Sequence, residues 1–403
     1  MQTLSIQAQV DEVTPHATAI RHRLHRHPEL MYEERCTAET VTDELEELGI
    51  EYKAGLAGGT GVIGWLPATT RAPGAAPTVG LRADMDALPI SEETELPYAS
   101  ENPGVMHACG HDGHTAVLLG AARVLAGVSQ RANNVLLLFQ PAEEGGAGGD
   151  RMCRDGALGG AAAGGLGQPV DIMYGLHGWP ELPVGKVATR VGPLLAATDE
   201  FTITVRGKGC HAAYPHLGLD PVVIAAEMVT ALQSIPARRV SPLDNVIITV
   251  GSIHAGHAHN VIPEEVRMLG TIRTLLASTR TQVEQDFRRL VSGIGAAHGA
   301  EVDINWHEGY PVTRNDPEAT ARFRRIASAT LGEDNVLERE HPTMGGEDFS
   351  YYGQRVPACF YFVGLCPPGV AEYPNLHTPR FDFNDDALPL AIGLTVQLAL
   401  DAL

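Results

Sequence analysis

One short segment of the chain concentrates side chains that bind metal ions. Residues 107–114 read His-Ala-Cys-Gly-His-Asp-Gly-His, which places imidazoles, a thiol and a carboxylate within eight positions. Thiolate, imidazole and carboxylate groups together suit zinc or a similar divalent ion. Two acidic pairs flank the segment at a distance, namely Asp84 with Asp86 and Glu143 with Glu144. These residue types predict a hydrolytic metal site.

The adjacent glutamates suggest a division of roles. Like charges side by side are costly unless cations offset them. A bare Glu-Glu pair is ordinarily a solvated acidic loop, but Glu143 and Glu144 closely follow the apolar run at residues 134–139. A position at the end of a buried strand favours function, with one carboxylate on a metal ion and the other free to move a proton.

The remaining histidines give weaker signals. His177 follows an apolar run, as the acidic residues do. This shared position favours a set of metal ligands that includes Cys109 and His111 over the alternative, in which Cys109 is merely buried and His111 caps a helix. His377, within Asn-Leu-His-Thr-Pro, would by itself more often be structural. His211 follows the glycine turn Gly-Lys-Gly-Cys, so we select it as a candidate, although its spacing leaves a surface role equally open. Residues 345–349 are either a turn that caps a helix or a loop that lines a crevice.

Short apolar strands alternate with helices in the first part of the chain. Apolar spacing predicts helices at residues 13–26, 33–48 and about 112–126, with Asp112 as the N-cap of the third. Apolar runs predict buried strands at residues 61–66, 78–82, 134–139 and 170–176. This alternation is typical of an α/β sheet with helices on both faces. Side chains that follow several strands of such a sheet converge on one crevice, as the acidic pairs and His177 would.

The pattern changes at about residue 190. A strand at 201–205, a helix at 220–235, strands at 246–253 and 266–274, a helix at 279–297 and a strand at 302–306 follow in turn. That order, β-α-β-β-α-β, is the ferredoxin-like unit. Helix and strand then resume, with an apolar strand at 358–364. We therefore expect a small domain at residues 190–306 inserted into a larger one made of residues 1–189 and 307–403.

Composition limits the classes of partner. A chain of 403 residues exceeds the usual size of one core, which agrees with two domains. The formal net charge of −20 argues against nucleic acid or an anionic membrane as the main partner. We expect neither a signal peptide nor a membrane span. The six cysteines lie far apart without paired spacing, so we expect no disulfide framework and a reducing, cytoplasmic location.

Together, these motifs resemble the metal-dependent amidohydrolase family of hippurate hydrolases, N-acyl-L-amino-acid amidohydrolases and auxin-conjugate hydrolases, a branch of the di-metal carboxypeptidase and aminoacylase group. The likeness runs from about residue 22 to residue 384. Its segments are residues 82–89, 106–115, 140–144, 175–177, 211–216, 260–263, 345–349 and 375–379. Two departures are visible: the family often has Gly-Ala-Lys after the glutamate pair where this chain has Gly-Gly-Asp at 148–150, and the loop at 159–167 is long for the family.

The resemblance implies a catalytic centre with two divalent ions per subunit, of zinc, manganese, cobalt or nickel. It places the metal ligands at Cys109, His111, Glu144, His177 and His377. Cys109 takes the position that bridges the ions, which is aspartate in the wider group, and His111 replaces a ligand that wider relatives place near Asp84. Asp84 and Asp86 would then orient ligands. Glu143 takes the position of the general base.

The resemblance also implies roles for the inserted domain. That domain serves the family as lid and dimer surface, so we expect a homodimer or higher homo-oligomer. His211 would donate to the developing oxyanion, in its own subunit or across the dimer. Asn260 and Arg273 are candidates for orienting the substrate carboxylate, although a surface salt bridge is an equal alternative for Arg273. The expected fold is α/β, with a di-metal exopeptidase-like catalytic domain, helices on both faces of a mixed sheet, and an inserted ferredoxin-like lid.

The expected reaction is hydrolysis of the amide bond of a small N-acyl-L-amino acid, which yields a carboxylic acid and a free amino acid. The nearest alternative is a metallo-carboxypeptidase or dipeptidase that acts on unblocked peptides, because it needs the same ions. A catalytically silent metal-binding or scaffold protein is an alternative of another class. The presence of Glu143 beside a full ligand set argues against that alternative.

Overall fold

The computed structural model describes residues 5–72 and 74–403, and the chain divides into two compact units. Unit 1 comprises Met1–Leu194, Arg314–His341 and Asp348–Leu403, and unit 2 comprises Leu195–Thr313 and Pro342–Glu347. These bounds lie a few residues beyond the predicted positions 190 and 306. Residues 342–347 also belong to the inserted unit, which we did not predict. The N–H of Ala196 in that unit donates to the carbonyl of Gly345 over 2.8 Å.

Unit 1 is built on an eight-stranded mixed sheet with the strand order β1-β2-β4-β3-β5-β16-β6-β15. The strands are β1 (Glu51–Leu56), β2 (Gly61–Leu66), β3 (Thr78–Asp84), β4 (Asn134–Gln140), β5 (Ile172–Pro183), β6 (Val187–Thr189), β15 (Val336–Glu338) and β16 (Ala358–Cys366). Strands β4, β3, β5 and β16 run parallel to one another. Their carboxyl ends therefore lie at one edge of the sheet, as the sequence predicted.

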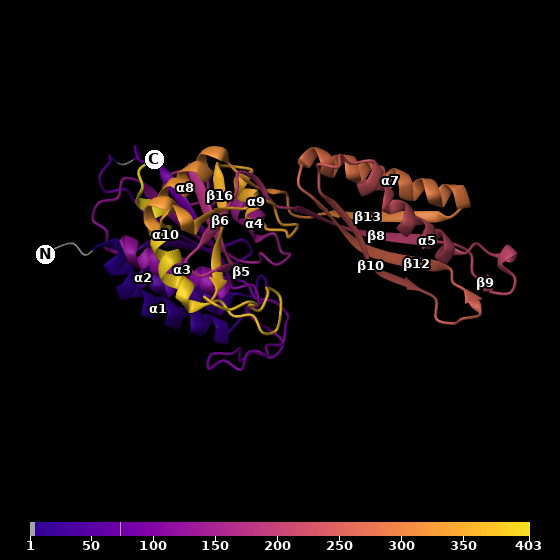
Figure 1. Cartoon of the computed structure of the whole chain (residues 1–403), viewed down its shortest axis with the longest axis horizontal. Helices are drawn as coiled ribbons and strands as arrows, with labels where there is room; N and C mark the ends of the chain where they lie inside the picture. Colours follow the sequence, from indigo (N-terminus) through magenta and orange to yellow (C-terminus); the bar gives the residue numbers. More distant parts are fainter. Residues whose placement is uncertain (1–4, 73) are drawn as a thin grey trace. The chain divides into compact units, whose positions relative to one another are not determined.

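Helices cover both faces of this sheet. Alternate residues of each strand point to opposite faces, and one set, which includes Leu81 and Leu137, packs in a single core with α1 (Ile6–Arg26), α2 (Arg35–Glu47), α3 (His111–Gly127), α8 (Pro317–Leu331) and α10 (Leu388–Leu400). On the other face lie α4 (Gly148–Arg154) and α9 (Ser350–Gly353). In Figure 1, α3 and α10 lie on one side of β5 and β16, and α4 and α9 on the other. Helices on both faces are thus confirmed.

The start of α3 differs from the prediction. The helix begins at His111, directly after Gly110, whose φ of 88° is the left-handed conformation that glycine adopts most easily. Asp112 does not cap the helix. It is fully buried, with its Oδ2 atom 3.2 Å from Nη1 of Arg21 and 2.8 Å from Nδ1 of His25. The prediction was wrong because both partners come from α1, far away in the sequence.

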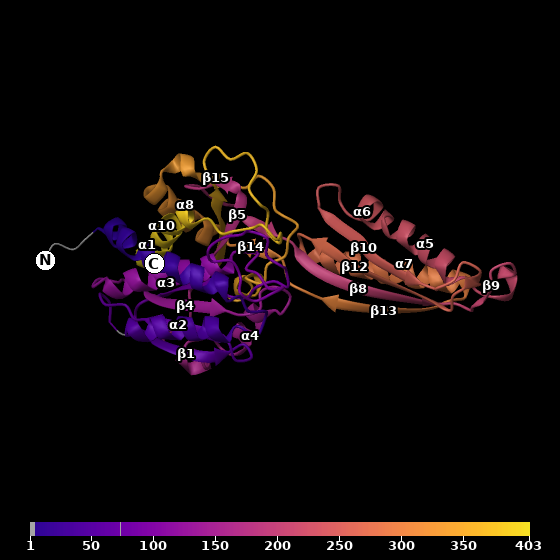
Figure 2. The ribbon, with the colours of Figure 1, turned by 90° about the horizontal axis from the view of Figure 1, so that it is seen from below.

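Unit 2 contains a four-stranded antiparallel sheet with the order β10-β12-β8-β13. Its strands are β8 (Ala197–Arg206), β10 (Val246–Ala255), β12 (Glu265–Thr274) and β13 (Glu301–Glu308). Helices α5 (Pro221–Leu232), α6 (Ser234–Arg238) and α7 (Ala277–His298) lie along one side of the sheet (Figure 2). Helix α5 begins after Asp220, whose side chain accepts the N–H of Val222 over 2.9 Å. The order of these elements matches the predicted β-α-β-β-α-β pattern.

The remaining elements are short. They are the strands β7 (Gly192–Leu195), β9 (Cys210–His211), β11 (Val261–Ile262) and β14 (Thr313–Asn315), and the 3₁₀ turns Ala161–Ala163, Pro215–Leu217, Glu333–Asn335 and Asp385–Ala387. Within residues 5–72 and 74–403, no helix combines the length and the apolar character needed to cross a membrane.

Candidate metal centre

Side chains from separate segments of unit 1 meet around Cys109. Its Sγ atom lies 3.3 Å from Nε2 of His177 and 3.3 Å from Nε2 of His377. The same nitrogen of His377 lies 3.2 Å from Oε1 of Glu144. His377 has a left-handed φ of 59°, and its N–H donates to the carbonyl of Ala108 over 2.8 Å. The backbone of this histidine is thus tied to the cysteine segment, a link that its local sequence did not reveal.

Cys109 belongs to two groups of potential ligands. The donor atoms of Cys109, His111 and His177 lie within 4.8 Å of one another, and so do those of Cys109, Glu144 and His377. A ligand common to two groups suits a pair of neighbouring ions that share it. The structure therefore brings together all five side chains that the sequence singled out as ligands, in a candidate di-metal site.

Hydrogen bonds fix which ring nitrogens face this site. Nδ1 of His177 lies 2.8 Å from the carbonyl of Gly178, and Nδ1 of His111 lies 2.9 Å from the carbonyl of Asp86. A carbonyl only accepts, so each Nδ1 carries the proton and donates. The Nε2 atoms are left for the site. Nε2 of His111 is buried and has no hydrogen-bond partner among the residues that the structure describes, as expected for a nitrogen that serves as a metal ligand.

His177 lies inside β5, and not after a strand as predicted. The strand continues to Pro183 because it pairs with β16, where His177 stands opposite Phe362. Its pairing with β3 ends earlier, at Arg82 and Gly175. His177 therefore still lies beyond the paired end of β3, beside the residues that follow that strand.

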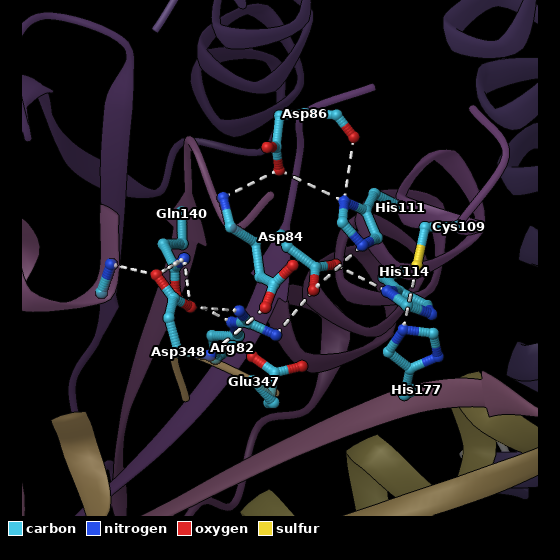
Figure 3. A network of polar contacts seen from close by, with 12 residues as sticks. Arg82, Asp84, Asp86, Cys109, His111, His114, Gln140, His177, Glu347 and Asp348 are labelled. Atoms are coloured by element: carbon cyan, nitrogen blue, oxygen red, sulfur yellow. Dashed lines mark hydrogen bonds and ion pairs between the residues drawn. The ribbon is translucent and has the colours of Figure 1, made fainter. Parts of the chain in front are cut away.

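His114, the last residue of the metal-rich segment, uses both of its ring nitrogens within the protein. Its Nδ1 lies 2.6 Å from Oδ1 of Asp84, and its Nε2 accepts the N–H of Gly178 over 2.9 Å. It therefore holds Asp84 and the backbone beside His177 in place. His114 stands next to His111 in Figure 3, but its nitrogens are already paired.

The two glutamates lie in the loop at residues 141–147, between β4 and α4. The carboxylate of Asp86 accepts the N–H of Glu143 over 3.0 Å and that of Glu144 over 2.9 Å. Oε1 of Glu143 accepts the N–H of Asp348 over 3.2 Å, and the residue is 7% exposed. Asp86 contacts both this loop and His111, so it orients two parts of the site at once.

A buried ion-pair network that we did not predict lies next to the site (Figure 3). Nη1 of Arg82 lies 2.7 Å from Oδ2 of Asp84, and Nη2 lies 3.0 Å from Oδ1 of Asp348. Asp348 also accepts from Nε2 of Gln140 over 2.7 Å and from the N–H of Gly149 over 2.8 Å. Arg82 and Gln140 are polar residues in fully buried and mostly apolar strands, a signal that could have identified the network. Asp348, from the segment left open by the sequence, belongs to this buried interior.

The electrostatics of the site fit divalent ions. Burial raises the pKa of the Cys109 thiol well above its usual value, and Glu144 adds to the rise. Burial lowers the pKa of His177, which keeps that imidazole neutral. Burial alone would lower the pKa of His111, but the carboxylates of Asp84, Asp86 and Glu144 together outweigh burial and raise the pKa to about 10. A bound cation would displace the protons of His111 and Cys109 and offset the carboxylates that surround them.

The other predicted site residues belong to unit 2. His211 is exposed in β9, opposite Val261 of β11, and the carbonyl of Asn260 accepts the N–H of Ala212 over 3.0 Å. Arg273 lies on β12, eight positions beyond Glu265, which is itself next to the β9–β11 pair along the chain. Eight strand positions span about 26 Å. The roles of Asn260 and Arg273 therefore stay separate predictions.

Comparison with known proteins gives a family. Residues 80–401 match the model of Peptidase family M20/M25/M40. The chain is 41% identical to the N-acetyl-L-cysteine deacetylase of Bacillus subtilis (strain 168), over 92% of this chain and 84% of that protein. It is 39% identical to thermostable carboxypeptidase 1 of Saccharolobus solfataricus, over 94% of each chain. It is 37% identical to the IAA-amino acid hydrolase ILR1-like 2 of Arabidopsis thaliana, over 98% of this chain and 87% of that protein.

Solved structures agree with the sequence matches. The fold is similar to that of the Bacillus subtilis YXEP protein, described as a dinuclear metal binding peptidase from the M20 family. The two chains are 32% identical and superpose with a TM-score of 0.81, over 97% of this chain and 98% of that one. The resemblance drawn from the motifs is confirmed, and the chain belongs to peptidase family M20/M25/M40.

Proposed function

We propose that this protein is a metal-dependent amidohydrolase that cleaves the amide bond of N-acyl-L-amino acids. The observation that carries the proposal is the buried carboxylate of Glu143 beside two ligand groups that share Cys109. The proposed ligands are Cys109, His111, Glu144, His177 and His377. Two bound divalent ions would lower the pKa of a water molecule and polarise the scissile carbonyl.

Glu143 is the proposed general base and acid. Its carboxylate would accept a proton from the attacking water and return it to the amine that leaves. One of its oxygens, Oε1, accepts the N–H of Asp348, and the Asp86 carboxylate holds the N–H of Glu143. One contact holds the backbone of Glu143 and the other holds its carboxylate, so the group that accepts the proton has a defined position. This fixed position supports the role of Glu143 over that of an ordinary surface acid.

The class of substrate is supported by the relatives. The deacetylase and the IAA-amino acid hydrolase are named for amides of amino acids, which favours N-acyl-amino acids here. The carboxypeptidase among the relatives favours a second candidate, the release of C-terminal residues from unblocked peptides. Asn260 or Arg273 would bind the substrate carboxylate, and His211 would donate to the oxyanion, in its own subunit or across a dimer.

A first experiment tests the chemistry. In Glu143→Gln, kcat should fall by about 10²–10⁴-fold, because the amide cannot accept the proton, while elemental analysis should still find the bound metal. Glu181→Gln, which changes an exposed residue of β5, is the matched control and should turn over normally. Normal turnover in Glu143→Gln would contradict the proposal.

A second experiment tests the substrate. The holoenzyme is assayed against N-acetyl, N-benzoyl and longer N-acyl amino acids, and against unblocked dipeptides and peptides. We expect hydrolysis of the acyl amino acids alone. Cleavage confined to unblocked peptides would favour the carboxypeptidase instead.

We also propose a homodimer formed through unit 2 and a cytoplasmic location. All six cysteines are free in the structure, which agrees with a reducing compartment. Light scattering after size-exclusion chromatography tests the dimer, and a single-chain mass would contradict it. Mixing His211→Ala with Glu143→Gln subunits under conditions that allow exchange tests a shared site. Recovered activity in the mixture would support His211 acting across the dimer, and none would place it in its own subunit.

A further inference from the structure

The loop at residues 141–147, which carries both glutamates, adopts a backbone that needs support. Ala142 has a φ of 55° and Ala147 a φ of 53°, both in the left-handed region. This region is unfavourable for residues other than glycine, and such residues keep it only where their surroundings enforce it. Asp86 holds the N–H groups of Glu143 and Glu144, but it does not hold Ala142.

Glu34 supplies the missing contact. It stands at the start of α2 and is fully buried. Its Oε1 atom accepts the N–H of Ala142 over 2.8 Å and that of Tyr32 over 2.9 Å, and its Oε2 atom accepts the hydroxyl of Thr60 over 2.7 Å. The N–H groups of three consecutive loop residues are thus received by two buried carboxylates, Glu34 and Asp86.

Tyr32 holds the other part of the loop. Its hydroxyl donates to the carbonyl of Gly146. Burial raises the pKa of Tyr32 to about 12, so the hydroxyl keeps its proton at neutral pH. The guanidinium of Arg151, on α4, lies 4.1 Å from the centre of the Tyr32 ring. A Cβ atom on Gly146 would lie 2.9 Å from that ring, so the loop backbone passes close to the tyrosine.

We propose that Glu34 and Tyr32 are positioning residues for the reaction. They fix the first and the later part of the loop at residues 141–147, and so set the place of the Glu143 carboxylate. The inference rests on the proposed role of Glu143 as general base. Neither residue belongs to the groups of potential metal ligands, so their removal should leave the bound metal in place.

The test compares kcat, KM and metal content of holoenzyme variants. A misplacement of about 1 Å can cost about 10²-fold in rate, so Glu34→Ala should lower kcat by about 10- to 100-fold, with KM and metal content within about twofold of wild type. Glu34→Gln should retain kcat within about threefold, because an amide oxygen can accept both N–H groups while its NH₂ faces the Thr60 hydroxyl. Tyr32→Phe keeps the ring and should lower kcat by about three- to tenfold.

A control and a second readout separate positioning from general destabilisation. Glu29→Ala removes a neighbouring carboxylate that accepts the N–H groups of Cys36 and Thr37 at the start of α2. It should lower the melting temperature and leave kcat unchanged. Hydrogen exchange followed by mass spectrometry should show faster exchange at residues 142–144 in Glu34→Ala, and unchanged exchange there in Glu29→Ala.

A double-mutant cycle identifies the route of the effect. If Glu34 acts through Glu143, adding Glu34→Ala to Glu143→Gln should not lower the residual rate further. The inference is overturned if folded, metal-loaded Glu34→Ala keeps its kcat, or if Glu34→Ala reduces the residual rate of Glu143→Gln by the full factor seen in wild type. Normal turnover in Glu143→Gln alone would instead overturn the proposed function.

Discussion

His25 should make the stability of unit 1 depend on pH. The residue is fully buried in α1, with its Nδ1 atom 2.8 Å from Oδ2 of Asp112 and its Nε2 atom 3.3 Å from Oε1 of Glu92. Burial alone would lower the pKa of His25, but the carboxylates of Asp112 and Glu92 together outweigh burial and raise the pKa from 6.5 to about 9. The pKa of Asp112 is lowered by the same ion pair, so its shift is not added to the stabilisation calculated from His25.

The size of the effect follows from the shift. A rise from 6.5 to about 9 corresponds to about 3 kcal/mol of unfolding free energy. Because the pKa is raised in the folded state, this stabilisation is fully present below pH 6.5 and is lost as the pH rises through 9. Replacing His25 by glutamine removes the titrating group, and with it this part of the pH dependence.

The assay is denaturant unfolding of wild type and His25→Gln at pH 6, 7.5 and 9.5, with matched metal content. A Trp306→Phe background leaves Trp65 and Trp179, both in unit 1, as the fluorescent reporters. The stability difference between wild type and variant should be about 3 kcal/mol larger at pH 6 than at pH 9.5. His16→Gln, which changes an exposed histidine of the same helix, is measured beside it as the control for a substitution in α1. A difference for His25→Gln that stays constant across this range would refute the reasoning.

Two further predictions concern the site itself. Gly148→Ala should lower both stability and turnover, because its Cβ atom would lie 1.7 Å from the carbonyl oxygen of Pro141. We expect the free energy of unfolding to fall by about 3 kcal/mol or more, as measured by denaturation. Gly293→Ala is the control and should leave stability and turnover unchanged, because its Cβ atom would meet no atom within 4 Å. Burial raises the pKa of Cys109, so metal binding must release its proton and the apparent affinity should fall as the pH falls. Titration calorimetry of chelator-treated protein in two buffers measures the released protons, and equal proton release by wild type and Cys109→Ala would contradict this role.

Local patterns were sufficient for many of the elements and for the edge of the sheet that carries the site. The apolar run at residues 134–139 corresponds to β4, and the predicted strand at 78–82 to β3. The parallel pairing of these strands then brings the residues after them together, as the βα alternation indicated. The predicted helix at 220–235 corresponds to α5 and α6, and α5 begins directly after Asp220, whose side chain caps its first turn.

Contacts between distant segments could not be predicted in this way. His377 resembled a structural histidine because its contact with Cys109 spans 268 positions. Asp112 resembled a helix cap because its partner Arg21 stands 91 positions earlier. Glu34 gave no signal at all, since its bond to Ala142 spans 108 positions. In each case the role of the side chain depends on contact with a group from a distant segment of the chain.

X-ray absorption at the metal edge tests the central claim, that Cys109 binds the ions, most directly. Active wild-type protein that contains zinc should show a sulfur neighbour at about 2.3 Å, and Cys109→Ala should lack that neighbour. Active wild-type protein whose metal ions have only nitrogen and oxygen neighbours would contradict the account.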